Sequence, residues 1–240
     1  MSAAVLVRAC GALAVALSAC SAASAAMLDT SATTGSLSAS ATFVASGSNL
    51  IITLTNTSTA DANVPADMLT AVFFDIAGPA LSLTRVGAVL APGSTVINSA
   101  VQPAGGVVGG EWAYVGGLVG APHGASHGIS SAGFGLFGPG ELFPGPNLDG
   151  PLSPNGVQHG ITSASDPGAN NNGGASVPLI RNAVVFTLGG LPSGFDPSTR
   201  ITNVSFQYGT GLDEPNLLVP APGAAGLFGL GLLAIGRRRR

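Results

Sequence analysis

The chain of 240 residues contains no lysine, and its eight positive charges are all arginines. Chemistry that needs a lysine, such as Schiff-base formation or phosphate binding by a P-loop, is therefore excluded. Charged residues make up only 8% of the chain, against roughly 25% in ordinary soluble domains. Between residues 29 and 214, three arginines accompany eleven acidic residues, which disfavours binding to nucleic acid or to anionic membranes.

Cysteine is almost absent too. Cys10 and Cys20 both lie close to the N-terminus, so the rest of the chain has neither a thiol nor a disulfide. A body of about 200 residues can bury enough apolar surface to fold without such cross-links. The sequence also lacks the G-x-S-x-G motif of serine hydrolases. We predict no cofactor.

Long amphipathic helices are missing between residues 27 and 216, whereas short strand-like segments recur there. Leu50, Ile52 and Leu54 alternate with mostly polar neighbours. The segment 69–76 (LTAVFFDI) is apolar on both faces except at Asp75, which predicts a central strand covered on both sides. We predict an all-β body, a β-sandwich of the jelly-roll or immunoglobulin-like type. Further strands are predicted at 183–188, at 204–208 as a half-buried strand, and from weaker patterns at 38–44, 81–90, 95–98 and 111–115.

Glycine, proline, serine and asparagine dominate residues 116–178, where few strand patterns occur. We predict a long Gly/Pro-rich loop insertion here, because connections of this length inside one domain are usually functional or disordered. The segment 166–174 (DPGANNNGG) has nothing to bury, so we expect an exposed tip. Apolar anchors in the first half should pack onto the body: Ile129, Phe134, Leu136, Phe137, Leu142 and Phe143.

The N-terminal residues 1–26 have the three parts of a secretory signal peptide: Arg8, an apolar stretch at 9–19, and a run of small residues that offers cleavage sites. The apolar stretch is too short to span about 30 Å of hydrocarbon. Leu17-Ser18-Ala19-Cys20 also resembles a bacterial lipobox, so lipidation of Cys20 is the alternative.

Residues 217–240 have a second tripartite pattern. Val219, Pro220, Ala221 and Pro222 precede fourteen uncharged residues, and four arginines end the chain at 237–240. Fourteen helical residues reach only about 21 Å, so this hydrophobic helix would be a short anchor. Arg237, Arg238, Arg239 and Arg240 should stay on the cytoplasmic side by the positive-inside rule.

This end resembles the PEP-CTERM sorting signal of Gram-negative bacteria, with Ala221 where the family usually has Glu. The resemblance implies export by the Sec translocon and transient anchoring in the inner membrane. It also implies recognition by an exosortase, a membrane transpeptidase-like protease, and delivery to the cell surface or to an extracellular matrix with exopolysaccharide. It covers about the last 22 residues and carries no activity for the body.

The segment Glu111-Trp112-Ala113-Tyr114 is the most distinctive part of the body. The only tryptophan, beside a tyrosine, could stack on a sugar while Glu111 accepts hydroxyl protons. The alternative, which we favour, is that Trp112 is a core anchor with Tyr114 on the same strand face.

Other polar residues give weaker patterns. His123 and His127 have the spacing of helical zinc ligands, but flanking Pro122, Gly124 and Gly128 break any helix, and we predict no metal site. Two acidic pairs, Asp61 with Asp67 and Asp213 with Glu214, lack the spacing of a calcium loop and are expected in solvated turns.

We therefore expect a non-enzymatic exported protein of the cell surface or extracellular matrix. One alternative is a carbohydrate-binding module that uses Trp112 and Tyr114. Others are a surface protein lipidated at Cys20 and a secreted hydrolase with its triad inside 116–178. Histidine and acidic side chains that converge in a cleft would favour the hydrolase.

Overall fold

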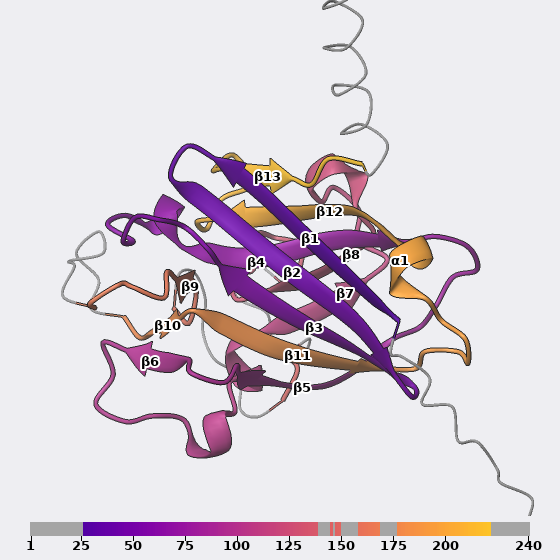
Figure 1. The fold of residues 1–240 in the computed structure, drawn as a ribbon, viewed down its shortest axis with the longest axis horizontal. Helices are drawn as coiled ribbons and strands as arrows, with labels where there is room; N and C mark the ends of the chain where they lie inside the picture. Colours follow the sequence, from indigo (N-terminus) through magenta and orange to yellow (C-terminus); the bar gives the residue numbers. More distant parts are fainter. Residues whose placement is uncertain (1–25, 139–144, 146, 150–157, 169–176, 222–240) are drawn as a thin grey trace, which may run out of the picture.

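The structure is a computed structural model that describes residues 26–138, 145, 147–149, 158–168 and 177–221. Its regular elements are almost all strands, arranged in two sheets, which confirms the all-β prediction (Figure 1). The first sheet has the order β1-β2-β3-β11-β5 with every pair antiparallel. Its strands are β1 (Met27–Thr34), β2 (Leu37–Ser46), β3 (Asn49–Asn56), β11 (Ala183–Gly189) and β5 (Thr84–Leu90).

The second sheet lies behind the first in Figure 1 and is built around β4. β12 pairs with one edge of β4, while β8 and β9 share the other edge, and β13 and β7 extend the sheet on the two sides. The only α-helix among the described residues is α1 (Pro197–Arg200), which directly precedes β12. The strands are β4 (Leu69–Ile76), β6 (Thr95–Ile97), β7 (Ala113–Gly116), β8 (His127–Ser130), β9 (Ile161–Thr162), β10 (Leu179–Arg181), β12 (Ile201–Tyr208) and β13 (Asn216–Leu218).

The central position of β4 confirms the prediction made for LTAVFFDI. Its first six residues are buried, and the side chains of the strand alternate between two apolar clusters. Val72 and Phe74 belong to the main core between the sheets, whereas Ala71 and Phe73 belong to a second cluster on the outer face. A strand with apolar partners on both faces needs a continuous apolar sequence, which β4 has.

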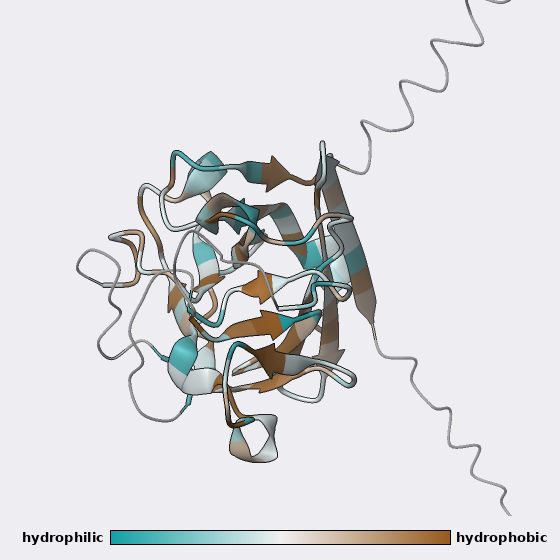
Figure 2. Ribbon diagram, turned by 90° about the vertical axis from the view of Figure 1, so that its left-hand side faces the viewer, coloured by the Kyte–Doolittle hydropathy of each residue, from teal (hydrophilic) through white to brown (hydrophobic). Residues whose placement is uncertain are grey.

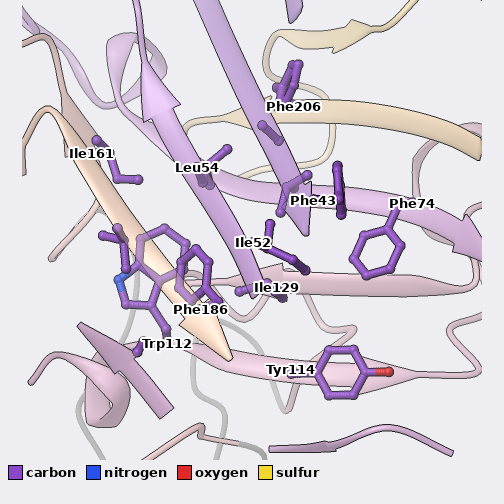
Figure 3. Packing of buried hydrophobic residues seen from close by; sticks show 14 of the residues in the cluster. Phe43, Ile52, Leu54, Phe74, Trp112, Tyr114, Ile129, Ile161, Phe186 and Phe206 are labelled. Atoms are coloured by element: carbon purple, nitrogen blue, oxygen red, sulfur yellow. The ribbon is translucent and has the colours of Figure 1, made fainter. Parts of the chain in front are cut away.

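The main core is closed by the alternating face of β3. Leu50, Ile52 and Leu54 are fully buried, as their spacing predicted. Phe43 meets Phe74 edge-to-face, with ring centroids 5.4 Å apart. These side chains interdigitate from both sheets (Figure 3), and the side view shows hydrophobic residues along many of the strands (Figure 2).

β12 differs from the half-buried strand that we predicted. Ser205 and Gln207, which alternate with Val204, Phe206 and Tyr208, are also fully buried. The residues after β12 fold back over this face, and the Gln207 amide donates to the carbonyl oxygens of 211 and 214 and accepts from the Asn216 amide. A polar residue is thus buried because a loop satisfies its hydrogen bonds.

The body also extends further than expected. The predicted boundary at residue 216 falls inside β13, where Leu217 is buried against the core. The backbone N–H of Val219 then donates to the carbonyl of Val204 at 2.8 Å. The described body therefore extends to Val219, the first residue of the expected sorting motif.

Residues 116–178 are not one long loop, and that prediction is corrected. β8 joins β4 to β7 inside the second sheet, and Ile129 lies fully buried in the main core. A Cβ on Gly128 would lie 2.8 Å from Phe73 and 2.9 Å from Phe137, so close packing requires glycine there. Because glycine weakens the alternating pattern of a strand, β8 was not predicted from the sequence.

The predicted anchors of this region pack as expected where they are described. Phe137 is buried against Phe73, with Phe134 and Leu136 partly buried beside it. Leu142 and Phe143 lie outside the described residues.

Asp166 is not part of an exposed tip, as its glycine- and asparagine-rich surroundings had suggested. Its side chain is buried and accepts hydrogen bonds from the backbone N–H of Ala62 and Gly168 and from the Thr162 hydroxyl. The carboxylate thereby ties β9 to the connection between β3 and β4. The rest of the expected tip, from residue 169, lies outside the described residues.

Phe74→Ala tests the central role of β4. We expect the free energy of unfolding to fall by about 3–5 kcal/mol, because truncation leaves a cavity between the sheets. Denaturant melts measure this change. Val119, which is 88% exposed, supplies a control, and Val119→Ala should change stability by less than about 0.5 kcal/mol. A loss below about 1 kcal/mol for Phe74→Ala would show that β4 is not central.

Candidate functional site

Three polar residues from three neighbouring strands lie at one end of the second sheet, where Tyr114 contacts His127 and the charge of Asp75 acts on His127 without a hydrogen bond between them. Asp75 is the next-to-last residue of β4, Tyr114 lies in β7, and His127 opens β8. Strand register brings them together, because His127 pairs with Phe74 on one side and with Gly116 on the other. We call these three residues the Asp75–Tyr114–His127 cluster.

His127 is fixed by a ring contact and by a hydrogen bond at Nδ1. The ring stacks on Phe74, with centroids 5.4 Å apart and planes 13° apart. Tyr114 lies beside the ring with its plane nearly parallel, centroids 6.2 Å apart, and its hydroxyl 2.9 Å from Nδ1. The second ring nitrogen, Nε2, has no hydrogen bond within the described part of the chain, and His127 lines the cleft described below.

The Asp75 carboxylate is held by donors from two further segments. Oδ1 accepts from the backbone N–H and the hydroxyl of Ser126 at 2.8 and 2.6 Å, and Oδ2 accepts from the Asn203 amide at 2.8 Å. Burial raises the pKa of Asp75, but the hydrogen bonds from Ser126 and Asn203 outweigh it and bring the pKa below its ordinary value. Asp75 is therefore a carboxylate at neutral pH.

The protonation states of the other two members follow from their burial. Burial lowers the pKa of His127, and the charge of Asp75 opposes this only in part, so the ring is neutral at pH 7. Burial raises the pKa of Tyr114 to about 12, so its hydroxyl keeps its proton. That hydroxyl can donate to Nδ1 of the neutral ring, which places the ring proton on Nε2.

The cluster borders an open cleft of about 580 Å³ between the β4–β5 connection and the ends of β7 and β8. Tyr114 and His127 line it, and a neighbouring cleft of about 480 Å³ continues past Tyr114 toward Arg85. The volume falls in the range of small-molecule sites. The described residues that line the larger cleft are Ile76, Gly78, Ala80, Leu81, Ser82, Leu83, Tyr114, Gly116, Gly117, Ser126 and His127.

A histidine and an acid lie in neighbouring strands here, but Asp75 bonds to Ser126 and Asn203 rather than to His127 and is not among the residues that line the cleft. A nucleophile paired with the histidine is also required. The Ser126 hydroxyl donates to Asp75, and no hydroxyl of a serine in the described segments hydrogen-bonds to His127. The geometry supports binding through the imidazole better than acyl transfer.

The sugar platform suggested by Glu111, Trp112 and Tyr114 is not formed. Trp112 is fully buried, and its ring packs on Phe186 with centroids 4.9 Å apart (Figure 3). Glu111 instead lies beside His159, with Oε2 3.2 Å from Nδ1. Trp112 is the core anchor that we favoured, since a covered ring has no face to offer a sugar. Tyr114 alone of the three reaches the cleft.

His123 and His127 form hydrogen bonds with different residues. His123 lies with Nε2 2.9 Å from the Asn216 side-chain oxygen, while His127 pairs with Tyr114. Across the described ranges, no group of three metal-ligating side chains comes together. The acidic residues Asp67 and Glu214 accept from nearby backbone N–H groups in their own turns.

Of the predicted sorting residues, Val219 is half-buried and Pro220 and Ala221 are exposed at the end of the body. Pro222, the arginines 237–240 and Cys20 lie outside the described residues, as does the expected C-terminal hydrophobic helix. No described helix is long and apolar enough to cross a membrane.

Sequence reasoning considered His127 only as a metal ligand and did not connect it with Asp75 or Tyr114. One pattern could have helped: Asp75 is the single charged residue in an otherwise apolar strand. A charge in such a place needs partners. Comparison with known proteins adds nothing further, because no family model, curated protein or solved structure matches the chain.

Trp112, the only tryptophan of the chain, gives a direct test of the buried position. We expect blue-shifted fluorescence that acrylamide quenches poorly, because solvent does not reach the ring. Addition of polysaccharide should leave the emission unchanged. Red-shifted, readily quenched emission that responds to polysaccharide would restore the platform formed by Glu111, Trp112 and Tyr114.

The two tyrosines of the chain should make the stability of the fold depend on pH in the alkaline range. Burial raises the pKa of both Tyr114 and Tyr208 to about 12, although hydrogen bonds with Ser58 and Ser38 oppose the change at Tyr208. The unfolded chain releases these protons near pH 10, so the free energy of unfolding should fall as the pH rises from about 10 to about 12.

Ultraviolet absorbance should therefore show little tyrosinate in the folded protein until the pH is well above 10. Tyr114→Phe and Tyr208→Phe should each remove half of the final signal. Ionisation of either tyrosine near pH 10 in the folded protein would contradict its burial.

Proposed function

We propose that this is a non-enzymatic exported protein of a Gram-negative bacterium, sorted by an exosortase to the cell surface or extracellular matrix. Two ordered patterns support the proposal, a signal peptide at 1–26 and a motif, apolar run and arginine cluster at 217–240. In this proposal the body is a β-sandwich of the jelly-roll or immunoglobulin-like type. Its partners are the Sec translocon, the exosortase and exopolysaccharide.

The junction between body and tail is the observation that carries the proposal. β13 pairs with β12, and among the described residues the backbone bond from Val219 to Val204 is the last one to the sheet. Pro220 and Ala221 come immediately afterwards and are exposed. A protease needs an accessible, extended segment, whereas peptide bonds inside β13 are protected by pairing.

The same junction makes the tail dispensable for folding. The core residues of β13 precede the motif, so cleavage after Val219 would remove no buried side chain of the described body. The proposal thus assigns the terminal segment a role in sorting and the two sheets a role outside the cell.

The intact mass of the mature protein from native cells tests this proposal. We expect a chain that lacks both the signal peptide and residues 223–240. The mass also separates the alternatives, because lipidation of Cys20 would add an acyl mass to a chain that begins at Cys20. A mature surface protein that retains the arginines 237–240 would refute sorting by cleavage.

Replacement of the four terminal arginines by serine should cause mislocalisation, since nothing then fixes the orientation of the short anchor. Replacement by lysine is the matched control, because it keeps the charge and should preserve the orientation. Correct surface delivery of the serine variant would contradict the proposed role of the arginine cluster.

A further inference from the structure

The cleft beside the Asp75–Tyr114–His127 cluster has a lining suited to a neutral polar ligand. Among the described residues that line it, none carries a formal charge at pH 7. Imidazole, phenol and serine hydroxyl groups supply hydrogen bonds, while Ile76, Leu81 and Leu83 supply apolar surface. Clefts that combine apolar walls with a few placed polar groups are typical of small-molecule sites.

Access to the polar groups depends on Gly116. A Cβ at this position would lie 3.0 Å from the Tyr114 hydroxyl and 3.2 Å from Nδ1 of His127. Any larger side chain would therefore crowd the hydrogen-bonded pair at the wall of the cleft. Gly117, the next residue, has φ +74°, a backbone conformation that favours glycine, and a Cβ there would have no heavy atom within 4 Å. No side chain therefore projects from this position at the edge of the cleft.

The polar groups are also in place before any ligand arrives. Phe74 stacks on the His127 ring, and the hydroxyl of Tyr114 holds Nδ1. Within the described part of the chain, this leaves Nε2 as the hydrogen-bonding atom of the ring without a partner. A ligand that bonds to it loses little free energy in ordering the site.

Charge narrows the class of ligand. Three arginines accompany eleven acids between residues 29 and 214, and Arg85 lies in the neighbouring cleft rather than in this one, which disfavours an anionic polymer here. A cation finds no carboxylate among the described lining residues. Among the described residues, the edge of β7 away from β8 is open only beyond the bridge between Ala113 and Asn147, at residues 114–116, so an extended peptide would find only a short strand edge.

We propose that this cleft binds a sugar unit of a neutral polysaccharide. The C–H face of the ring packs on Leu81 and Leu83, and its hydroxyls bond to Nε2 of His127 and to the serines of the lining. This site deepens the proposed function, since it rests on exopolysaccharide being a partner of the body, but it does not depend on sorting by an exosortase.

The imidazole of His127 is the reporter for the test, because the chain has only three histidines. Mature protein is titrated with neutral hexasaccharides of glucose, galactose and mannose, and the imidazole resonances are followed by NMR. We expect at least one neutral hexasaccharide to shift His127 in a saturable way, without shifting His159. An oligogalacturonate and an uncharged Gly/Ser peptide of similar length are the competing probes.

Ala80→Trp is the blocking variant, since Ala80 is exposed and lines the cleft. Its matched control is Ala60→Trp, at an exposed alanine outside the cleft lining. We expect at least tenfold weaker binding for Ala80→Trp and unchanged binding for Ala60→Trp. Tyr114→Phe, which keeps the ring but frees Nδ1, should also weaken binding, with an altered pKa of His127.

Three results would overturn the proposal. The first is that none of the neutral hexasaccharides shifts His127. The second is that oligogalacturonate or the peptide binds more tightly than any of them. The third is that Ala80→Trp binds as well as the unmodified protein. Each is independent of the mass measurement, so this proposal and the sorting proposal fail separately.

Discussion

Strand β4 is covered by apolar side chains on both faces, and the rest of the structure depends on that double burial. Phe74 faces the core shared with the first sheet, and Phe73 faces the cluster formed by Phe137 and its neighbours. Both layers lose their common partner if β4 moves. The described segment 117–138 after β7 therefore packs on the sheet, although its sequence is rich in glycine.

The end of β4 also determines where the polar residues of the candidate site lie. β4 is apolar until Asp75, where it leaves the core, and the charge there is stabilised by Ser126 and Asn203 from two other segments. His127 lies next to Phe74 in the adjacent strand, at the edge of the core, and the charge of this carboxylate acts on its ring. The cleft exists where the apolar packing of β4 ends, which couples its geometry to the stability of the core.

Val219 closes the described body at its C-terminal side. Among the described residues it is the last whose backbone N–H bonds to a sheet, and Pro220 and Ala221 after it are exposed. In the function that we propose, the terminal segments serve export and sorting, while the body presents a cleft whose lining residues come from β4, β7, β8 and the connection after β4.

Much of the architecture was predictable from the sequence, because strands leave a period-two pattern in neighbouring residues. Local alternation identified β3, and the unbroken apolar run identified β4. β8 and the burial of Gln207 were not predictable, because a glycine required by Phe73 and Phe137 weakens one pattern and a returning loop covers the other. The sequence by itself determined the all-β class and the identity of the buried β4. Only the tertiary structure decided that Asp75, Tyr114 and His127 meet, because strand register joins residues that lie far apart in the chain.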